Sequence, residues 1–205
     1  MRFQNLAYAI LKNPIIYWTY QKIVGGDNAR KRFIEAVVKP HKTMKLLDIG
    51  CGPGNILDFM PPLDYYGFDN NPAYIEAAKN TYKNRGTFIC SDIWDFNDLG
   101  TGNFDTVLAV GVIHHLDDAT AQQLFKTAYA ALKTGGKLIT FDGCYTKKQN
   151  PIAYWMLRLD RGKFVRRQEA YEALANTSFK HIKSTLNTTY FSIPYTSLIM
   201  ECTKD

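Results

Sequence analysis

The sequence predicts an α/β protein with a doubly wound, mostly parallel seven-stranded sheet whose last strand is antiparallel. Three observations lead to this fold class. Strand-like and helix-like segments alternate through residues 44–142, which is the pattern of βαβ units. A glycine-rich turn follows the first strand directly, as in sheets that hold a ligand at the carboxyl ends of their strands. After residue 142 the alternation stops, and two final strands form a hairpin-like pair that suits an antiparallel edge.

Each core element follows from its local sequence. Short apolar runs predict five strands, at Lys45–Ile49, Tyr65–Phe68, Thr87–Cys90, Phe104–Val110 and Lys137–Phe141. Helices are expected between them, at 56–60, 72–83 and 119–132. Pro61-Pro62 stops the first helix, because proline cannot continue it. Asn71-Pro72 opens the second, with Asn71 as N-cap and Pro72 at the first helical position. Thr134-Gly135-Gly136 is expected to end the third helix.

The flanking segments complete what we expect to be a single domain over residues 1–205, because 46% hydrophobic content over this length suffices for one core. Residues 1–43 are predicted to form a helical lid, with helices at 2–24 and at 29–38, the latter capped by Asp27 or Asn28. Residues 44–142 form the ligand-binding core and residues 143–178 an inserted cap with helices at 150–160 and 167–176. Residues 179–205 form the final strands, His181–Leu186 and Ser197–Thr203.

The cysteine content and the apolar segments indicate the cellular compartment of the protein. The four cysteines, Cys51, Cys90, Cys144 and Cys202, form no C-x-x-C pair, so we expect reduced thiols in a cytoplasmic protein. The first 20 residues lack the small-residue cleavage site of a signal peptide. No stretch approaches the roughly 20 apolar residues of a spanning helix, so no stable membrane insertion is expected.

Charge is unevenly distributed along the chain, whose net charge is +6. Residues 1–45 carry nine Lys/Arg against two Asp/Glu, residues 46–146 six against twelve, and residues 147–183 nine against three. Two explanations of the basic segments are open. They are either solvated surface lysines or a basic cap that attracts an anionic substrate or surface. These segments lack the extent and aromatic interleaving of a nucleic-acid groove, so no nucleic-acid partner is expected.

The glycine turn is Gly50-Cys51-Gly52-Pro53-Gly54, preceded by Asp48. Glycines at alternate positions let a backbone approach a ligand closely. The G-x-G-x-G spacing differs from the G-x-G-x-x-G of dinucleotide sites, whose third glycine would fall on Asn55. A tight turn without a ligand is the alternative, so the remaining strand ends are informative.

Acidic residues follow the next two strands. Asp69 ends the second strand, where an ionised carboxylate can accept hydrogen bonds from both ribose hydroxyls of a nucleoside. The third strand leads into Ser91-Asp92-Ile93, where the aspartate can accept from an adenine amino group and Ile93 can pack on the ring.

In this order the motifs resemble those of the class I S-adenosylmethionine (SAM) methyltransferases. Within that class, the chain is similar to the type 11 and type 25 methyltransferase domains, which act on small molecules. The resemblance covers residues 44–142 and includes the strand start Phe104-Asp105-Thr106-Val107. It also includes Leu132–Gly136, where the family commonly has proline at the position of Thr134. The resemblance implies SAM as cofactor and S-adenosylhomocysteine as product; no metal site is expected, because the cysteines form no C-x-x-C pair. It implies cofactor-binding residues at Asp48, Gly50, Cys51, Gly52, Gly54, Asp69, Asn70, Ser91, Asp92, Ile93 and Val110. The acidic core agrees with a cationic sulfonium and would disfavour the pyrophosphate of NAD.

Three further residues are candidates for catalysis. His114 and His115 follow the fourth strand, and a histidine titrates near neutral pH, so either can accept a proton from the methyl acceptor. Asp142 follows the fifth strand at the same edge and can orient a histidine or act as the base itself. The alternatives are a helix cap or polar filler for the histidines and a turn residue for Asp142. A base matters most for a hydroxyl acceptor, so O-methylation is favoured over N- or C-methylation.

The acceptor is expected to be a small molecule, such as a sugar, a cell-envelope precursor or another anionic metabolite. Tyr145, Arg158 and Arg166 are its candidate ligands, because aromatics beside arginines suit an acceptor with an apolar body and an anionic group. Ordinary helix packing is the alternative. Three other functions stay open: an NAD-dependent oxidoreductase, a non-catalytic SAM-binding partner or sensor, and a methyltransferase for lipid or quinone at the membrane surface. The protein is expected to be a monomer or a homodimer.

Overall fold

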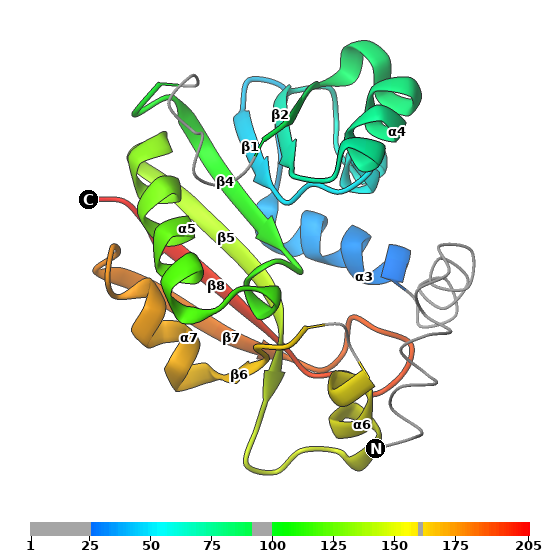
Figure 1. The fold of residues 1–205 in the computed structure, drawn as a ribbon, viewed down its shortest axis with the longest axis vertical. Coiled ribbons are helices and arrows are strands. Elements are labelled where there is room, and N and C mark those ends of the chain that lie inside the picture. The colour runs from blue at the N-terminus through cyan, green and yellow to red at the C-terminus, as the bar shows by residue number, and fades with distance from the viewer. Residues whose placement is uncertain (1–25, 92–99, 160–161) are drawn as a thin grey trace.

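The computed structural model describes residues 26–91, 100–159 and 162–205. Its centre is a sheet with the strand order β3-β2-β1-β4-β5-β8-β7 (Figure 1). The strands are β1 (Lys45–Ile49), β2 (Asp64–Asp69), β3 (Thr87–Cys90), β4 (Phe104–Val110), β5 (Leu132–Tyr145), β7 (His181–Asn187) and β8 (Ser197–Thr203). Strands β1 to β5 pair in parallel, and β8 is antiparallel to both β5 and β7. The predicted fold class is confirmed.

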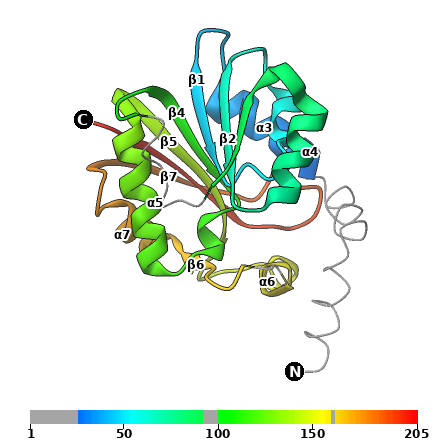
Figure 2. The same ribbon diagram turned by 45° about the horizontal axis from the view of Figure 1, so that its top comes forward.

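Helices cover both faces of this sheet, as Figure 2 shows for α5 and α7 against α3 and α4. The α-helices are α3 (Gly26–Phe33), α4 (Pro72–Tyr82), α5 (Asp118–Ala131), α6 (Pro151–Leu159) and α7 (Gln168–Ala175). A π-helical turn (Ile34–Val38) extends α3, and 3₁₀ turns form at Asn55–Phe59, Lys83–Arg85 and Ile113–His115. The helices predicted at 2–24 lie outside the described residues.

Two apolar clusters fill the space between sheet and helices because successive side chains of a strand point to opposite faces. Leu47 of β1 lies in one cluster, together with side chains of α5 and α7. Its neighbour Leu46 lies in the other, together with side chains of α3 and α4. The core strands are therefore buried on both faces, as in parallel sheets generally.

Two of the predicted helix starts can be compared with the structure. The Asn71 side chain accepts a hydrogen bond from the Ala73 backbone N–H at 3.0 Å, so the predicted N-cap of α4 is confirmed. The predicted caps of α3 are wrong, because Asp27 and Asn28 lie inside the helix that includes Gly26. Asp27 instead pairs with Arg30, 2.7 Å away and one turn further along the helix.

The start of β5 also differs from the prediction. The strand begins at Leu132 directly after α5, and Thr134-Gly135-Gly136 lies within it. A register shift against β4 accommodates this segment, and Gly135 takes a φ of +78°. The reason is pairing with the end of the chain: Gly135 N–H donates to Lys204 O at 2.9 Å, and Lys204 N–H donates to Gly136 O at 3.0 Å.

A short eighth strand, β6 (Arg166–Arg167), is absent from the sequence prediction. It pairs in parallel with the far end of β5, where Cys144 and Tyr145 face Arg166 and Arg167. The segment after α6 therefore returns to the carboxyl edge of the sheet before α7 begins.

Candidate functional site

The glycine turn joins the ends of β1 and β2. Gly50 and Cys51 both donate their backbone N–H to Phe68 O, at 2.7 and 2.9 Å. Gly50 has a φ of +72°, and a Cβ there would lie 2.6 Å from Val112 Cγ2. Glycine is therefore required at this position both by the backbone conformation and by the side chain of the loop after β4.

Gly52 is different, because its surroundings are open. It has a φ of +54°, and a Cβ built on it would meet no heavy atom within 4 Å. Its backbone N–H donates to Asp69 Oδ2 at 2.9 Å. The turn thus presents bare backbone beside a carboxylate, which leaves room for a ligand.

Asp69 lies half-buried at the end of β2, where the sequence places it. Its second carboxylate oxygen, Oδ1, accepts the Asn71 backbone N–H at 2.8 Å. Each oxygen of an ionised carboxylate can accept about two hydrogen bonds, so both keep capacity for ligand hydroxyls. Ser91 N–H donates to Asp69 O at 3.2 Å, which brings the end of β3 alongside. Asn70 is exposed next to this carboxylate, and Asp92 and Ile93 lie outside the described residues.

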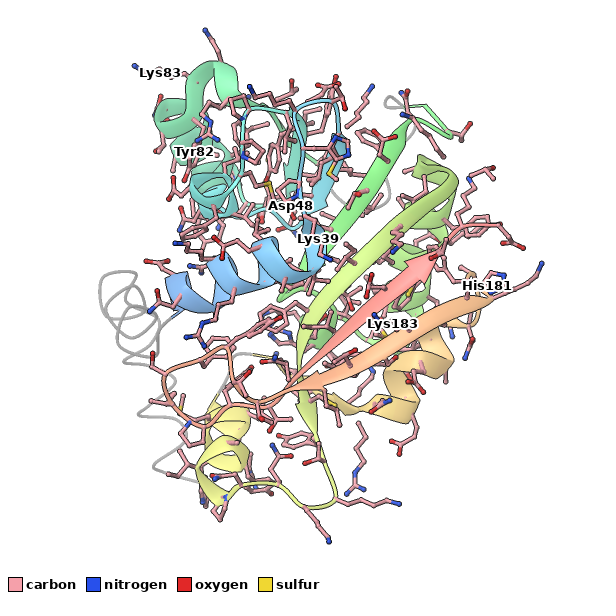
Figure 3. All side chains as sticks on the ribbon, turned by 180° about the vertical axis from the view of Figure 1, so that it is seen from behind. Lys39, Asp48, Tyr82, Lys83, His181 and Lys183 are labelled. Atoms are coloured by element: carbon pink, nitrogen blue, oxygen red, sulfur yellow. The ribbon has the colours of Figure 1, made fainter. Side chains whose placement is uncertain are left out.

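Asp48 is not at the surface of the turn but beneath it. Its side chain is buried, and Tyr65 Oη–H donates to Asp48 Oδ2 at 2.7 Å. Burial raises the pKa of this carboxyl to about 7, and the charge of Asp69 adds to the effect. Figure 3 shows Asp48 in the half of the molecule that contains α4, with Lys183 of β7 at the other end of the sheet. Asp48 supports the turn from within, with Tyr65 as a partner that the sequence did not single out.

The remaining predicted cofactor residues line the same edge. Burial, reinforced by the carboxylates of Asp48 and Asp69, raises the pKa of the half-buried Cys51 thiol. This thiol is therefore not a thiolate near neutral pH. All four cysteines are free thiols. Val110 is half-buried at the end of β4, and Gly54 is packed against the rings of Tyr82 and Phe88.

His114 and Asp142 form a buried pair at the ends of β4 and β5. His114 Nδ1 lies 2.7 Å from Asp142 Oδ1, and the His114 backbone N–H donates to the same oxygen at 3.2 Å. The side chains are only 7% and 2% exposed. Asp142 Oδ2 is also buried and has no hydrogen-bond partner among the described residues. The sequence prediction brought these two residues to one edge, and the structure brings them into contact.

The two histidines are not equivalent. His115 is exposed, and its ring lies against that of His114 with 4.2 Å between centroids. His114 is enclosed: a methyl group at Gly162 would overlap its ring, and Phe164 N–H donates to His114 O at 2.9 Å. Gly162 carried no signal in the sequence, because it is 48 positions away from the histidine that it covers.

Arg166 holds the loop that carries His114. Its guanidinium donates to the backbone oxygens of Ile113 and Leu116, at 3.2 and 2.8 Å, and to Phe164 O at 2.9 Å. It also donates through Nε and Nη2 to Asp118 Oδ1, at 3.0 and 2.6 Å. A guanidinium has five N–H donors, and these contacts use all of them. Arg166 was a predicted substrate ligand, but in the structure its donors are occupied by groups of the protein itself.

Tyr145 and Arg158, the other predicted acceptor ligands, gather around α6. The Tyr145 ring lies 5.8 Å from that of Tyr154. The Arg158 guanidinium lies 5.9 Å from the Tyr154 ring centroid and 5.8 Å from that of Trp155. These two predicted ligands are thus linked through Tyr154, whereas Arg166 lies with the His114 loop.

Fold and site together define a class I SAM-dependent methyltransferase domain of Rossmann-like fold. The seven-strand order, the glycine turn after β1 and the acid after β2 are its features. Residues 46–136 match the family model described as "Methyltransferase domain". The methyl donor typical of the family is SAM, and its product is S-adenosylhomocysteine.

Curated relatives agree on the class but differ in their acceptors. Ubiquinone biosynthesis O-methyltransferase of Cereibacter sphaeroides is 29% identical over 153 residues, which cover 66% of this chain and 60% of that protein. Phosphoethanolamine N-methyltransferase 1 of Zea mays is 27% identical over 188 residues, covering 87% of this chain and 36% of that protein. The chain thus spans at most 60% of the length of these two relatives.

Among solved structures, the pyocyanin biosynthetic protein PhzM superposes with a TM-score of 0.74 at 14% identity. The match covers 96% of this chain and 61% of PhzM, and at this identity it shows a shared fold.

No group of three or more His, Cys, Asp or Glu residues is placed to hold a metal ion within residues 26–91, 100–159 and 162–205. In the same ranges, no helix is long and apolar enough to cross a membrane.

Proposed function

We propose that this protein transfers a methyl group from SAM to a hydroxyl oxygen of a small molecule, and that the acceptor hydroxyl binds at the His114–Asp142 pair. The observation that carries the proposal is Asp142 Oδ2, a buried carboxylate oxygen that has no partner in the described part of the chain. Burying such an atom without a hydrogen bond is unfavourable, and a ligand hydroxyl would satisfy it.

The glycine turn fits the proposed cofactor. Gly52 offers bare backbone with open space around its Cβ position, and Asp69 keeps hydrogen-bonding capacity for two ribose hydroxyls. When bound, SAM supplies a methyl group already activated by its sulfonium. The proposed contacts of the bound nucleoside include Gly50, Cys51, Gly54, Asn70, Ser91, Asp92, Ile93 and Val110. Asp48 contributes from beneath the turn.

The His114–Asp142 pair is suited to take up a proton. Asp142 Oδ1 is already occupied by Nδ1 and the backbone N–H of His114. The other oxygen, Oδ2, then accepts the hydrogen bond of the acceptor hydroxyl and receives its proton as the oxygen attacks the methyl group. The hydrogen bonds from His114 fix the carboxylate in one orientation, so alignment of the acceptor is prepared before it binds.

Cofactor binding is the first test. We would titrate SAM, S-adenosylhomocysteine and NADH into the protein by calorimetry, with Asp69→Ala alongside. Binding of both sulfur nucleosides that weakens at least tenfold in the variant supports the proposal. Preference for NADH would instead indicate the oxidoreductase. Tight SAM binding without turnover of any acceptor would indicate a SAM-binding partner or sensor.

The acceptor atom needs a separate test, because the two relatives name oxygen in one case and nitrogen in the other. Methyl transfer from SAM would be assayed with pools of hydroxylated acids, sugars and amines. For a hydroxyl acceptor, Asp142→Asn should lower kcat by about 10²–10⁴-fold, the usual effect of losing a base, and leave SAM affinity unchanged. His115→Gln is the matched control and should keep kcat. Transfer to an amine that Asp142→Asn leaves intact would overturn the assignment of the acceptor atom.

A further inference from the structure

The outward face of α6 is apolar where a surface helix is normally charged. Ala153 and Leu157, one turn apart, are buried, and Leu157 packs against Gly143 of β5. On the opposite face Trp155 and Ile152 are each 56% exposed, and Tyr154 is 38% exposed. An amphipathic surface helix places charged or polar side chains at such positions.

These exposed side chains form a patch rather than a scatter. Within the described ranges, six large hydrophobic side chains are exposed, and three of them belong to this one helix. A fourth, Phe164, follows α6 in the same cap segment and is 39% exposed. Single exposed apolar residues are normal on a protein surface, but a cluster marks a contact site.

Basic residues flank α6 in the sequence and are exposed. Residues 143–159 contain no Asp or Glu. Lys147 and Lys148 are exposed just before α6, Arg158 is exposed within it, and Lys163 is exposed after it. The first acidic residue after this range is Asp160, and the next are Glu169 and Glu172 of α7. The surface of α6 is therefore suited to a partner with negative charge.

Aromatic side chains mixed with lysine and arginine are typical of segments that lie at a membrane interface. Trp and Tyr prefer the headgroup level, and Lys and Arg reach the phosphates of anionic lipids. Arg158 lies over the rings of Tyr154 and Trp155, which keeps its charge at the level of the aromatic side chains. In Figure 2, α6 lies at one end of the molecule, apart from the helices that pack on the sheet.

We propose that the outward face of α6, with Lys147, Lys148 and Lys163, docks this protein reversibly on the surface of a bilayer that contains anionic lipids. The contact is peripheral, because a helix of nine residues is too short to cross the hydrocarbon core. It would hold the protein at the level of lipid headgroups and of amphiphilic acceptors dissolved in the bilayer; only this last step rests on the proposed function.

The test is flotation of the full chain with vesicles of phosphatidylcholine, alone or mixed with 30% phosphatidylglycerol. We expect binding to the mixed vesicles only, and a loss of about tenfold or more between 50 and 500 mM salt. Ile152→Ser with Trp155→Ser should weaken binding at least tenfold, and so should Lys147→Glu with Lys148→Glu.

Matched controls come from α4. Tyr74→Ser removes a side chain that is 41% exposed, and Lys79→Glu reverses an exposed charge. Both should bind vesicles like the unmodified protein, and all variants should keep its SAM affinity and circular dichroism. Absence of binding, binding that ignores lipid charge, or equal loss in the α4 controls would overturn the proposal. This test does not depend on the methyl-transfer assay, so the two proposals can fail separately.

Discussion

At the residue scale, burial separates carboxylates that look alike in the sequence. Asp48 and Asp69 each stand at the end of a strand, but Asp48 is buried against Tyr65, whereas Asp69 is half-buried at the open side of the glycine turn. The first therefore contributes mainly to stability and the second mainly to ligand binding.

Asp48 should make stability depend on pH. Because burial raises its pKa from 3.8 to about 7, the folded state keeps a proton that the unfolded chain releases between these values. Its contribution to stability is fully present below about pH 4 and is lost as pH rises through 7. Relative to Asp48→Asn, the unmodified protein should lose roughly 3 kcal/mol of unfolding free energy between pH 5 and pH 8.

Urea denaturation of both proteins at several pH values measures this difference. Tyr65→Phe, which removes the hydroxyl donor, serves as a second probe and should raise the pKa of Asp48 further. Parallel pH curves for the unmodified protein and Asp48→Asn would contradict the assignment.

Gly50 and Gly52 should respond differently to alanine. Both have positive φ, so each alanine costs about 1–3 kcal/mol in backbone strain. Gly50→Ala should be the more destabilising of the two, because its Cβ also meets Val112, and adding Val112→Ala should restore part of the loss. Gly52→Ala should mainly weaken SAM binding. Thermal unfolding with calorimetry separates the two effects, and equal destabilisation without any change in affinity would count against a ligand at Gly52.

At the element scale, the loop after β4 owes its shape to β6. Arg166 of β6 donates to two backbone oxygens on either side of the His114–His115 turn, and Phe164 donates to His114 itself. The position of the histidine is thus determined from the opposite end of the cap segment.

Arg166→Lys should disturb this loop although it conserves the charge, because an ammonium cannot reach three carbonyls and a carboxylate at once. We expect kcat to fall at least tenfold with a smaller change in the KM for SAM, and the unfolding temperature to drop by several degrees. Arg167→Lys, an exposed neighbour in the same strand, is the control. If both variants behave alike, Arg166 does not position the loop.

The sequence predicted those elements that depend on local patterns. The bounds of β1, β3 and β4 agree with the predicted ones, and Asn71-Pro72 marked the start of α4. The extension of β5 and the presence of β6 escaped prediction, because they depend on pairing with Lys204 and with the end of β5.

The same distinction between local patterns and long-range contacts applies to the site. Strand ends in a parallel sheet meet at one edge, so Asp69, His114 and Asp142 could be placed together from the sequence. The burial of Asp48 beneath Tyr65 and the hydrogen bonds of Arg166 to the His114 loop and Asp118 could not, because they depend on contacts between residues 17 to 53 positions apart.

At the scale of the whole molecule, the sign of the charge changes between the core and its flanks. Residues 46–146 carry twelve acidic and six basic side chains and contain the proposed cofactor site, whereas residues 147–183 are basic. On our proposals, a cationic cofactor and an anionic surface would each be attracted to a different part of one chain.

This charge pattern predicts that salt affects the two sulfur nucleosides unequally. SAM carries a positive sulfonium that S-adenosylhomocysteine lacks, so raising salt from 20 to 300 mM should weaken SAM binding a few-fold more. Calorimetric titrations of both at each ionic strength give the ratio. A ratio that stays constant would show that the acidic core does not contribute to cofactor affinity.

The pairing of β5 with β6 has a consequence for how such a protein can diversify. Tyr145 and Arg167 lie side by side, so the roughly twenty residues between them leave the sheet and return to the same place. Lengthening or replacing an excursion with fixed ends costs little, about 0.6 kcal/mol for each doubling of its length. We therefore propose that this stretch can be exchanged between homologues to change the acceptor, provided that Phe164 and Arg166, which hold the His114 loop, are kept.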